Sequence, residues 1–288
     1  MLYSIGSTSV ALRKNLVKLK TQSVIGFPVT AESFETQVDT LLGWAQQRLS
    51  KVVCVANVHM LIEAKHHRGF ANILHRADML TPDGMPLVWL TSWISNRRQD
   101  RVAGMDILLS LCHKAIQKNV SLFFLGSTPT ILDRMQQRLN REFPDLPIAG
   151  MEDLPFRPLT YEEDEALIHR LNNSGAGIVL VSLGCPKQER WMTAHKNKVN
   201  AVMIGSGGVF PVFAGAQKWA PAWVRKSGLE WLYRLLQEPR RLWKRYAKTI
   251  PLFLWLASKQ LVKVYLGLEP STFSPTRKNI AMEHQGKR

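Results

Sequence analysis

Residues 178–188 read IVLVSLGCPKQ, a short run rich in β-branched and apolar residues that leads into a turn with a glycine and a proline. Three other runs have the same character: KVVCVA at 51–56, VSLFFL at 120–125 and AVMI at 201–204. Short runs of this composition predict strands that are buried on both faces of a sheet. These four segments therefore decide the class of fold.

Amphipathic segments of helical length separate the predicted strands. Buried strands that alternate with such helices predict βαβ units, in which a mainly parallel sheet carries helices on both faces. We therefore predict an α/β fold. The helical segments are Thr30–Leu49, Met60–Arg76, Met105–Lys118, Thr130–Phe143, Glu162–Asn172 and Gln188–Lys196.

The chain of 288 residues carries 38 Lys and Arg against 22 Asp and Glu, a formal net charge of +16. This basic balance predicts a polyanionic partner or surface. The three cysteines are widely spaced, which argues against a disulfide framework and favours a reducing cytoplasm. We expect no secretory signal and no membrane-spanning helix, because the most apolar run, Ile250–Ala257, is too short to cross a bilayer.

Most of the excess charge lies in residues 215–266, which contain five tryptophans, eleven Lys and Arg and only two acids. Cations interleaved with aromatic rings suit an anionic membrane interface, and they also suit nucleic-acid phosphates and bases. Pro221 and Pro239 predict helices near 222–237 and 240–264. The segment is thus a basic, Trp-rich helical appendage whose partner is either a lipid surface or a nucleic acid.

The same features divide the chain into four parts. Residues 1–22 form a basic N-terminal leader, and 23–214 form the α/β core. Residues 215–268 form the helical appendage. The polar, proline-containing stretch 269–288 is predicted to be disordered.

In an open parallel sheet, ligands bind beyond the carboxyl ends of the strands. Gly126 and Ser127 follow one predicted strand, in a Gly-Ser-Thr-Pro turn that either binds a phosphate or forms a plain helix N-cap. Gly205 and Gly207 follow another strand and allow a close backbone approach to a ligand, or simply a tight turn. Gln188 begins a helix after a third. Together these turns favour a phosphate-bearing ligand.

Two charged residues are further candidates. Asp83 lies in Pro-Asp-Gly, which is either a turn or a carboxylate held at a strand end, where it is able to act as a general base. Arg101 is either a solvated cation or an anion-binding side chain, and spacing does not choose between them. The histidines and cysteines show no metal-ligand spacing, so we predict no metal and no cofactor.

Several motifs, taken in their order along the chain, resemble those of the WecG/TagA/CpsF family of bacterial glycosyltransferases. The resemblance spans roughly residues 23–250. The matching stretches are VCVANVHML (53–61), ADMLTPDGMPLV (77–88), RVAGMDIL (101–108), FFLGSTP (123–129), SLGCPKQERW (182–191), IGSGGVFP (204–211) and AGAQKWAPAWVRKSGLEWLYRLLQEPRR (214–241).

The resemblance implies a Rossmann-like, metal-independent transferase that inverts the anomeric carbon. Its donor would be a UDP-sugar carrying N-acetylmannosamine, N-acetylmannosaminuronic acid or glucose. The acceptor would be a polyprenyl-diphosphate-linked saccharide in cell-surface or exopolysaccharide biosynthesis. The enzyme would act as a peripheral protein on the cytoplasmic face of the inner membrane, with its oligomeric state left open. Deletion of residues 215–288 is expected to abolish turnover and to leave a folded core.

By the same resemblance, Asp83 matches the catalytic base, and Asn57, Arg101 and Gln188 match substrate-pocket residues. Arg234 and Arg241 match arginines of an appendage that reaches the donor diphosphate. One departure concerns the position two residues before Asn57, where the family often has Thr and this chain has Val55.

Three alternatives stay open. A nucleic-acid-binding protein would use the same basic segment, although no helix-turn-helix, RNP or zinc pattern appears. An epimerase or dehydrogenase would also use a sugar nucleotide, but the GxGxxG and Tyr-x-x-x-Lys patterns are missing. The third is a non-catalytic, membrane-associated member of the family.

Overall fold

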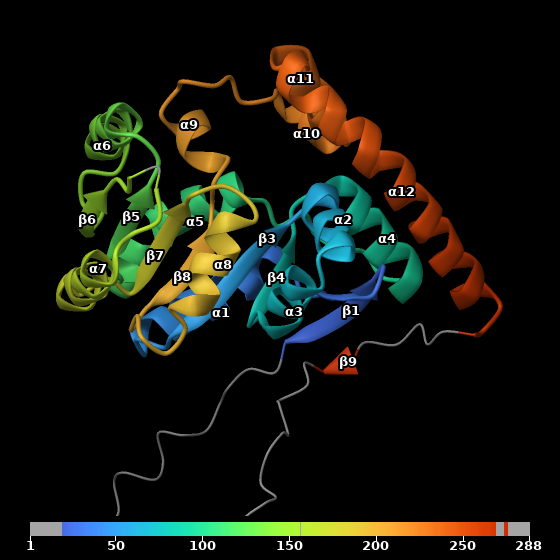
Figure 1. Ribbon diagram of the computed structural model, residues 1–288, viewed down its shortest axis with the longest axis horizontal. Helices are drawn as coiled ribbons and strands as arrows, with labels where there is room; N and C mark the ends of the chain where they lie inside the picture. Colours follow the sequence, from blue (N-terminus) through green and yellow to red (C-terminus); the bar gives the residue numbers. More distant parts are fainter. Residues whose placement is uncertain (1–18, 156, 269–273, 276–288) are drawn as a thin grey trace, which may run out of the picture.

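The computed structural model describes residues 19–155, 157–268 and 274–275. At its centre lies a six-stranded sheet in the order β4-β3-β8-β7-β5-β6 (Figure 1), in which every neighbouring pair is parallel. The four strands predicted from sequence are present, and β4 and β6 join them. Their bounds are β3 (Lys51–Ala56), β4 (Met79–Pro82), β5 (Leu122–Gly126), β6 (Ile148–Glu152), β7 (Ile178–Ser182) and β8 (Val202–Gly205).

Helices cover both faces of the sheet because successive strand side chains point to opposite faces. In β3, Val53 and Val55 belong to one buried cluster, and Val52 and Cys54 belong to the other. The first cluster is covered by α1 (Phe34–Gln46), α5 (Gly104–Lys118), α6 (Pro129–Glu142) and α9 (Val209–Phe213). The second is covered by α2 (Val58–His66), α3 (Arg68–Arg76), α4 (Met85–Ser95), α7 (Tyr161–Asn173) and α8 (Lys187–Ala194). The Rossmann-like α/β prediction is confirmed.

Two predicted helices are each divided in two. The segment Met60–Arg76 is interrupted at His67, whose extended backbone separates α2 from α3. The helix predicted near 222–237 is wrong as a single element, because α10 (Ala222–Lys226) and α11 (Glu230–Gln237) are separate. Gly228 lies between them with φ +75°, a left-handed conformation that a right-handed helix cannot contain. The helix α4 has no counterpart in the sequence prediction.

The described part of the chain begins with an antiparallel hairpin of β1 (Lys20–Val24) and β2 (Phe27–Thr30). Strand β1 therefore includes the last residues of the predicted leader, 20–22. Strand β9 (Ser274–Pro275) pairs with β1, so this part of the predicted tail forms a strand. Residues 1–18 of the leader, and 269–273 and 276–288 of the tail, lie outside the described residues.

The long helix α12 (Pro239–Tyr265) runs from α11 down one side of the molecule to the hairpin (Figure 1). It packs against α2 and α4, and its Phe253 and Ala257 belong to the buried cluster of that face. Gln260 accepts a hydrogen bond from the Ile25 N–H at 2.7 Å and donates one to the Ser23 carbonyl at 2.9 Å. One face of the C-terminal half of α12 is therefore packed on the core.

No helix in the described residues is both long enough and apolar enough to cross a bilayer.

Candidate active site

A cavity of about 340 Å³ lies beyond the carboxyl ends of β3, β4, β7 and β8. These strands are neighbours in the sheet, so residues that follow them in different parts of the sequence meet at one edge. Helices α11 and α12 supply the opposite wall. Seven of the predicted site residues line the cavity: Asn57, Asp83, Arg101, Gln188, Gly207, Arg234 and Arg241. Val55, the departure from the family pattern, lines it too.

Asp83 directly follows β4 and is half-buried in the cavity wall. Its backbone N–H donates to the Ala56 carbonyl at 2.9 Å, which holds the turn against the end of β3. Burial raises the pKa of Asp83 to about 7, and the nearby cation of Arg101 opposes this rise. A carboxylate with this pKa can accept a proton from a substrate hydroxyl at neutral pH, as a general base must.

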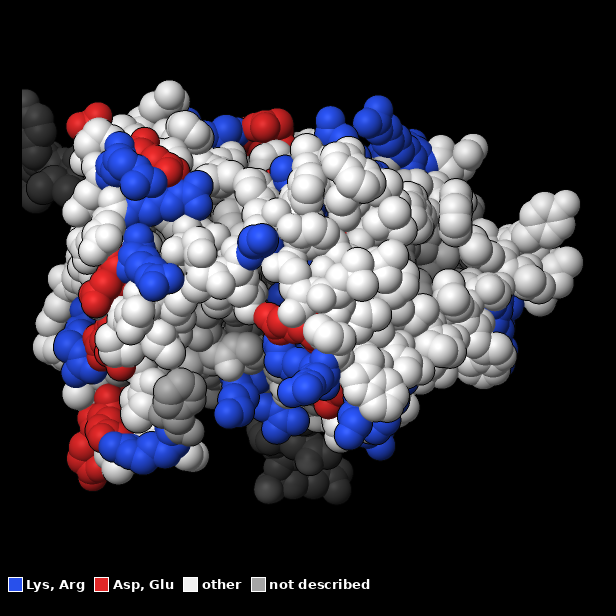
Figure 2. Space-filling model, turned by 90° about the horizontal axis from the view of Figure 1, so that it is seen from above, with Lys and Arg blue, Asp and Glu red and all other residues white. Residues whose placement is uncertain are grey.

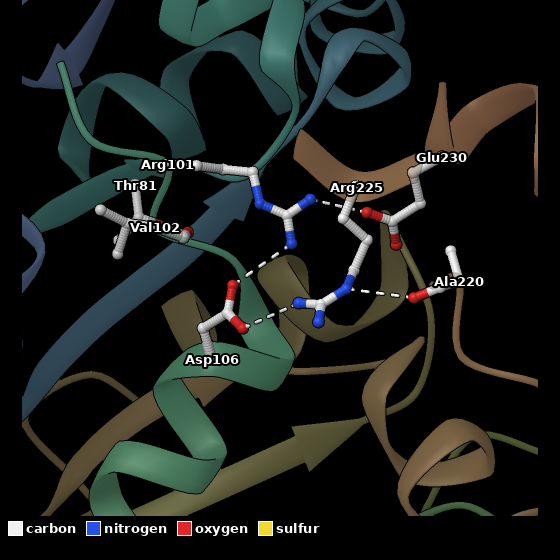
Figure 3. A network of polar contacts seen from close by, with 7 residues as sticks. All are labelled: Thr81, Arg101, Val102, Asp106, Ala220, Arg225 and Glu230. Atoms are coloured by element: carbon white, nitrogen blue, oxygen red, sulfur yellow. Dashed lines mark hydrogen bonds and ion pairs between the residues drawn. The ribbon is translucent and has the colours of Figure 1, made fainter. Parts of the chain in front are cut away.

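Arg101 is held by a polar network (Figure 3). Its guanidinium donates to Glu230 of α11 at 2.6 Å and to Asp106 of α5 at 3.2 Å. Arg225 of α10 also contacts Asp106, at 3.4 Å, and donates to the Ala220 carbonyl at 3.1 Å. The network therefore ties the C-terminal helices to the core beside Asp83.

The oxygen and the nitrogen of the Asn57 side-chain amide have different roles. Its Oδ1 accepts a hydrogen bond from the Met60 N–H at 3.1 Å and so caps α2. Its Nδ2 has no hydrogen-bond partner in the described part of the chain and is left to donate to a ligand. The position thus stabilises a helix and offers a donor to the cavity at the same time.

Gly205, the last residue of β8, and Gly207, which follows it, make room for Gln188. A Cβ on Gly205 would lie 2.8 Å from Nε2 of Gln188, and a Cβ on Gly207 would lie 2.6 Å from its Oε1. Nε2 also donates to the buried carboxyl of Glu189 at 2.7 Å. Gly205 does not line the cavity. Its effect on a ligand would therefore pass through the position of Gln188.

Three arginines of the C-terminal helices point their charge toward the cavity. Arg234 has no ion-pair partner among the described residues, and its guanidinium nitrogens lie 3.6 and 3.8 Å from where a Cβ of Gly208 would be. Arg241 is paired with Glu238. Arg245 also lines the cavity, although the sequence analysis did not single it out. Its spacing of four from Arg241 on one helix was the available signal.

Gly126 and Ser127 do not line this cavity, and their surroundings favour the N-cap alternative. The Ser127 N–H donates to the Ser182 carbonyl at 3.0 Å and is not open to a phosphate. Thr128 caps α6 by accepting from the Ile131 N–H. A Cβ on Gly126 would lie 2.7 Å from the Ser182 carbonyl oxygen, so close packing of β5 on β7 accounts for this glycine.

His59 and Trp219 are cavity residues that sequence reasoning missed. Burial, assisted by the charge of Arg245, lowers the pKa of His59, so its ring is neutral at pH 7. Trp219 holds the guanidinium of Arg225 3.9 Å from its ring centroid and lines the cavity. It is therefore a site residue, in contrast to the exposed tryptophans. Across the described ranges, no group of three His, Cys, Asp or Glu side chains is arranged to hold a metal ion.

The outer surface differs between the two ends of the molecule (Figure 2). Acidic and basic side chains mix at the end that contains α6 and α7, whereas the opposite end has broad uncharged areas bordered by Lys and Arg. The C-terminal helices carry four tryptophans that are exposed to solvent. The exposed fractions are 69% for Trp223, 37% for Trp231, 54% for Trp243 and 59% for Trp255.

The fold and the cavity define an open α/β protein with a basic ligand site at the carboxyl edge of its parallel sheet. Residues 22–266 match the Glycosyl transferase WecG/TagA/CpsF family. The chain belongs to this family and is a glycosyltransferase.

Named relatives support the assignment. The chain is similar to the N-acetylglucosaminyldiphosphoundecaprenol N-acetyl-beta-D-mannosaminyltransferases of Bacillus subtilis and Bacillus spizizenii. The B. subtilis enzyme is 29% identical over 79% of this chain and 87% of its own length. The B. spizizenii enzyme is 33% identical over 74% of this chain and 80% of its own length. The Staphylococcus aureus enzyme of the same name is 30% identical over 74% of this chain and 81% of its own length.

Proposed function

We propose that this chain transfers a hexosyl residue from a UDP-sugar to a hydroxyl of a polyprenyl-diphosphate-linked saccharide, with inversion and without a metal ion. The printed names of its relatives motivate the acceptor class, and they make N-acetylmannosamine the first sugar to test. The observation that carries the proposal is that Asp83 lines the same cavity as Arg234, whose guanidinium has no ion-pair partner among the described residues.

In this reaction Asp83 accepts the proton of the acceptor hydroxyl, and the oxygen of that hydroxyl forms a bond to the anomeric carbon of the donor. The bond from that carbon to the diphosphate oxygen breaks, and UDP leaves with the electron pair. General-base catalysis of this kind contributes about 10²–10⁴-fold in rate.

Negative charge grows on the leaving diphosphate, and Arg234 and Arg241 are positioned to stabilise it. Positively charged donors that are held in place before the reaction stabilise developing charge without reorganisation. Arg241 would exchange its present partner, Glu238, for the diphosphate. Asn57 and Gln188 would contact the donor from the strand ends.

The proposal places the enzyme as a peripheral protein on an anionic membrane, at the cytoplasmic face where its lipid-linked acceptor is presented. Exposed tryptophans and Lys or Arg on the C-terminal helices support this, since rings bind at the headgroup level and cations bind anionic lipid. We expect flotation with liposomes that contain anionic lipid, and loss of flotation at high salt. Equal flotation with neutral liposomes would contradict the proposed attraction between the basic side chains and anionic lipid.

The decisive experiment measures UDP release by the purified protein with and without EDTA. Donors are UDP-N-acetylmannosamine, its uronic acid and UDP-glucose, each with and without polyprenyl-diphosphate-linked N-acetylglucosamine in liposomes. Acceptor-dependent release from one donor is the expected result. Release that EDTA abolishes would overturn the metal-free mechanism, and release from no donor would overturn the proposed reaction.

A further inference from the structure

A second cavity, of about 660 Å³, opens between α4 and α10 on the other side of the Arg101 network. Arg101 lines both cavities, so the two are separated by one side chain and its partners. Asp106, which holds both Arg101 and Arg225, lines the second cavity as well. The cavity therefore adjoins the candidate active site and is distinct from it.

One wall of the second cavity is apolar and comes from α4. Val88 and Trp89 lie three and four residues after Met85, so all three are on one side of the helix. Gly228 leaves room for the Trp89 ring, because a Cβ there would lie 2.6 Å from the ring carbon Cη2. Trp93 lies four residues after Trp89, on the same side of α4, and is 64% exposed.

The facing wall is cationic. Arg98, Arg225 and Lys226 line the cavity together with Arg101, against the two carboxylates Asp100 and Asp106. Asp106 is occupied by Arg101 and Arg225, and Asp100 accepts the Phe34 N–H at 3.1 Å. Arg98 and Lys226 are exposed, and neither has an ion-pair partner within the described part of the chain. Two cations are thus available to an anion beside an apolar helix face.

The second cavity combines, beside the candidate active site, the groups that a lipid-linked acceptor would contact. Asp83 lies two residues before Met85, which lines the second cavity, and Arg98 follows the C-terminal end of α4. A ligand with a sugar at Asp83, a diphosphate at Arg98 and Lys226 and an apolar chain over Trp89 and Trp93 would meet suitable chemistry at each position.

We propose that this second cavity binds the prenyl diphosphate of the acceptor, with Arg98 and Lys226 contacting the phosphates and Trp89 contacting the first prenyl units. The inference rests on the proposed function, because it assigns the acceptor's lipid end to a site separate from the donor's. It also gives α4 a part in membrane contact beside the C-terminal helices.

Binding of farnesyl diphosphate to the full chain tests the site without turnover. The measurement is equilibrium dialysis of the labelled compound, with and without saturating UDP, and with inorganic pyrophosphate and farnesol as comparison ligands. We expect farnesyl diphosphate to bind in the presence of UDP and more tightly than either comparison ligand. Displacement by UDP would place the prenyl diphosphate in the first cavity and overturn the proposal. Equal binding of pyrophosphate would reduce the site to a phosphate site and overturn its prenyl part.

Variants identify the residues. The double variant Arg98→Ala/Lys226→Ala and the single variant Trp89→Ala should each weaken binding by about tenfold or more. The control Arg240→Ala/Lys248→Ala removes the same charge from exposed positions of α12 outside both cavities, and should bind normally. Wild-type binding by Arg98→Ala/Lys226→Ala, whose residues are exposed and unpaired, would overturn the site.

Turnover separates this inference from the proposed function. If transfer occurs, Arg98→Ala/Lys226→Ala should raise the KM for the acceptor and leave the KM for the donor unchanged. Transfer with an unchanged acceptor KM would refute the second site while the proposed reaction stands. The expected binding pattern without transfer to any acceptor would leave the site standing and refute the proposed reaction.

Discussion

Among single residues, Asp83 is the one on which the proposed reaction depends most. It lies in a turn, and burial raises the pKa of its carboxyl group to about 7. A general base works only when ionised, so kcat/KM should rise about tenfold per pH unit below pH 7 and level off above it. An Asp with its ordinary pKa of about 3.9 would give a flat profile from pH 5 upward. A flat profile would therefore show that another group limits the reaction.

Asp83→Asn should lower kcat at least about a hundredfold and change donor binding little, because the amide keeps the shape and loses the proton acceptor. Steady-state rates together with UDP binding check this. The control Asp145→Asn makes the same change at an exposed position outside the cavity and should behave as wild type. Near wild-type turnover in Asp83→Asn would make Asp83 a turn residue only.

Asn57 allows stability and binding to be separated. Asn57→Ser keeps a side-chain oxygen for the Met60 N–H and loses the amide donor, whereas Asn57→Ala loses both. The alanine variant should lower the free energy of unfolding by about 1 kcal/mol relative to the serine variant. Both should raise the donor KM, as measured beside thermal unfolding. If only the alanine variant raises the KM, the residue acts through the helix cap alone.

At the scale of the element, the break between α10 and α11 depends on Gly228. Gly228→Ala introduces both a side chain at φ +75° and a contact of 2.6 Å with Trp89. Gly175→Ala has nearly the same φ, +77°, with its nearest atom 3.9 Å away, and so isolates the backbone cost. Urea unfolding should show a loss of about 1–2 kcal/mol for Gly175→Ala and at least ~1 kcal/mol more for Gly228→Ala. If both variants lose the same free energy of unfolding, the Trp89 ring moves aside without a measurable loss of stability.

At the scale of the whole molecule, α12 joins the C-terminal segment to the core. Deletion of residues 215–288 removes Phe253 and Ala257 from a shared buried cluster, and each large apolar side chain lost from such a site costs ~1.5–3 kcal/mol. We therefore expect the fragment 1–214 to be destabilised as well as inactive, unlike the folded core expected from sequence. Truncation after residue 275 is the control, because it keeps β9 paired with β1, and it should keep the Tm of the full chain. An unchanged Tm in fragment 1–214 would show that the helices form a separable appendage.

The local pattern predicted much of the fold. The apolar runs of β3, β5, β7 and β8 and the amphipathic helices between them required a parallel sheet, because each run is buried on both faces. β4 reads MLTP and β6 reads IAGME, and these short runs with a proline or a glycine carry too weak a signal. The hairpin of β1 and β2 lay partly within the segment assigned to the leader.

The local sequence was enough to predict where a site would form, since Asn57, Gln188 and Gly207 follow predicted strands and the carboxyl ends of parallel strands meet at one edge of the sheet. Only the tertiary structure decided what surrounds them. The contact of Arg101 with Glu230 joins positions 129 residues apart, and no local periodicity encodes such a pair. The raised pKa of Asp83 has the same origin, because burial depends on which helices close over the sheet and not on the turn that carries the carboxylate.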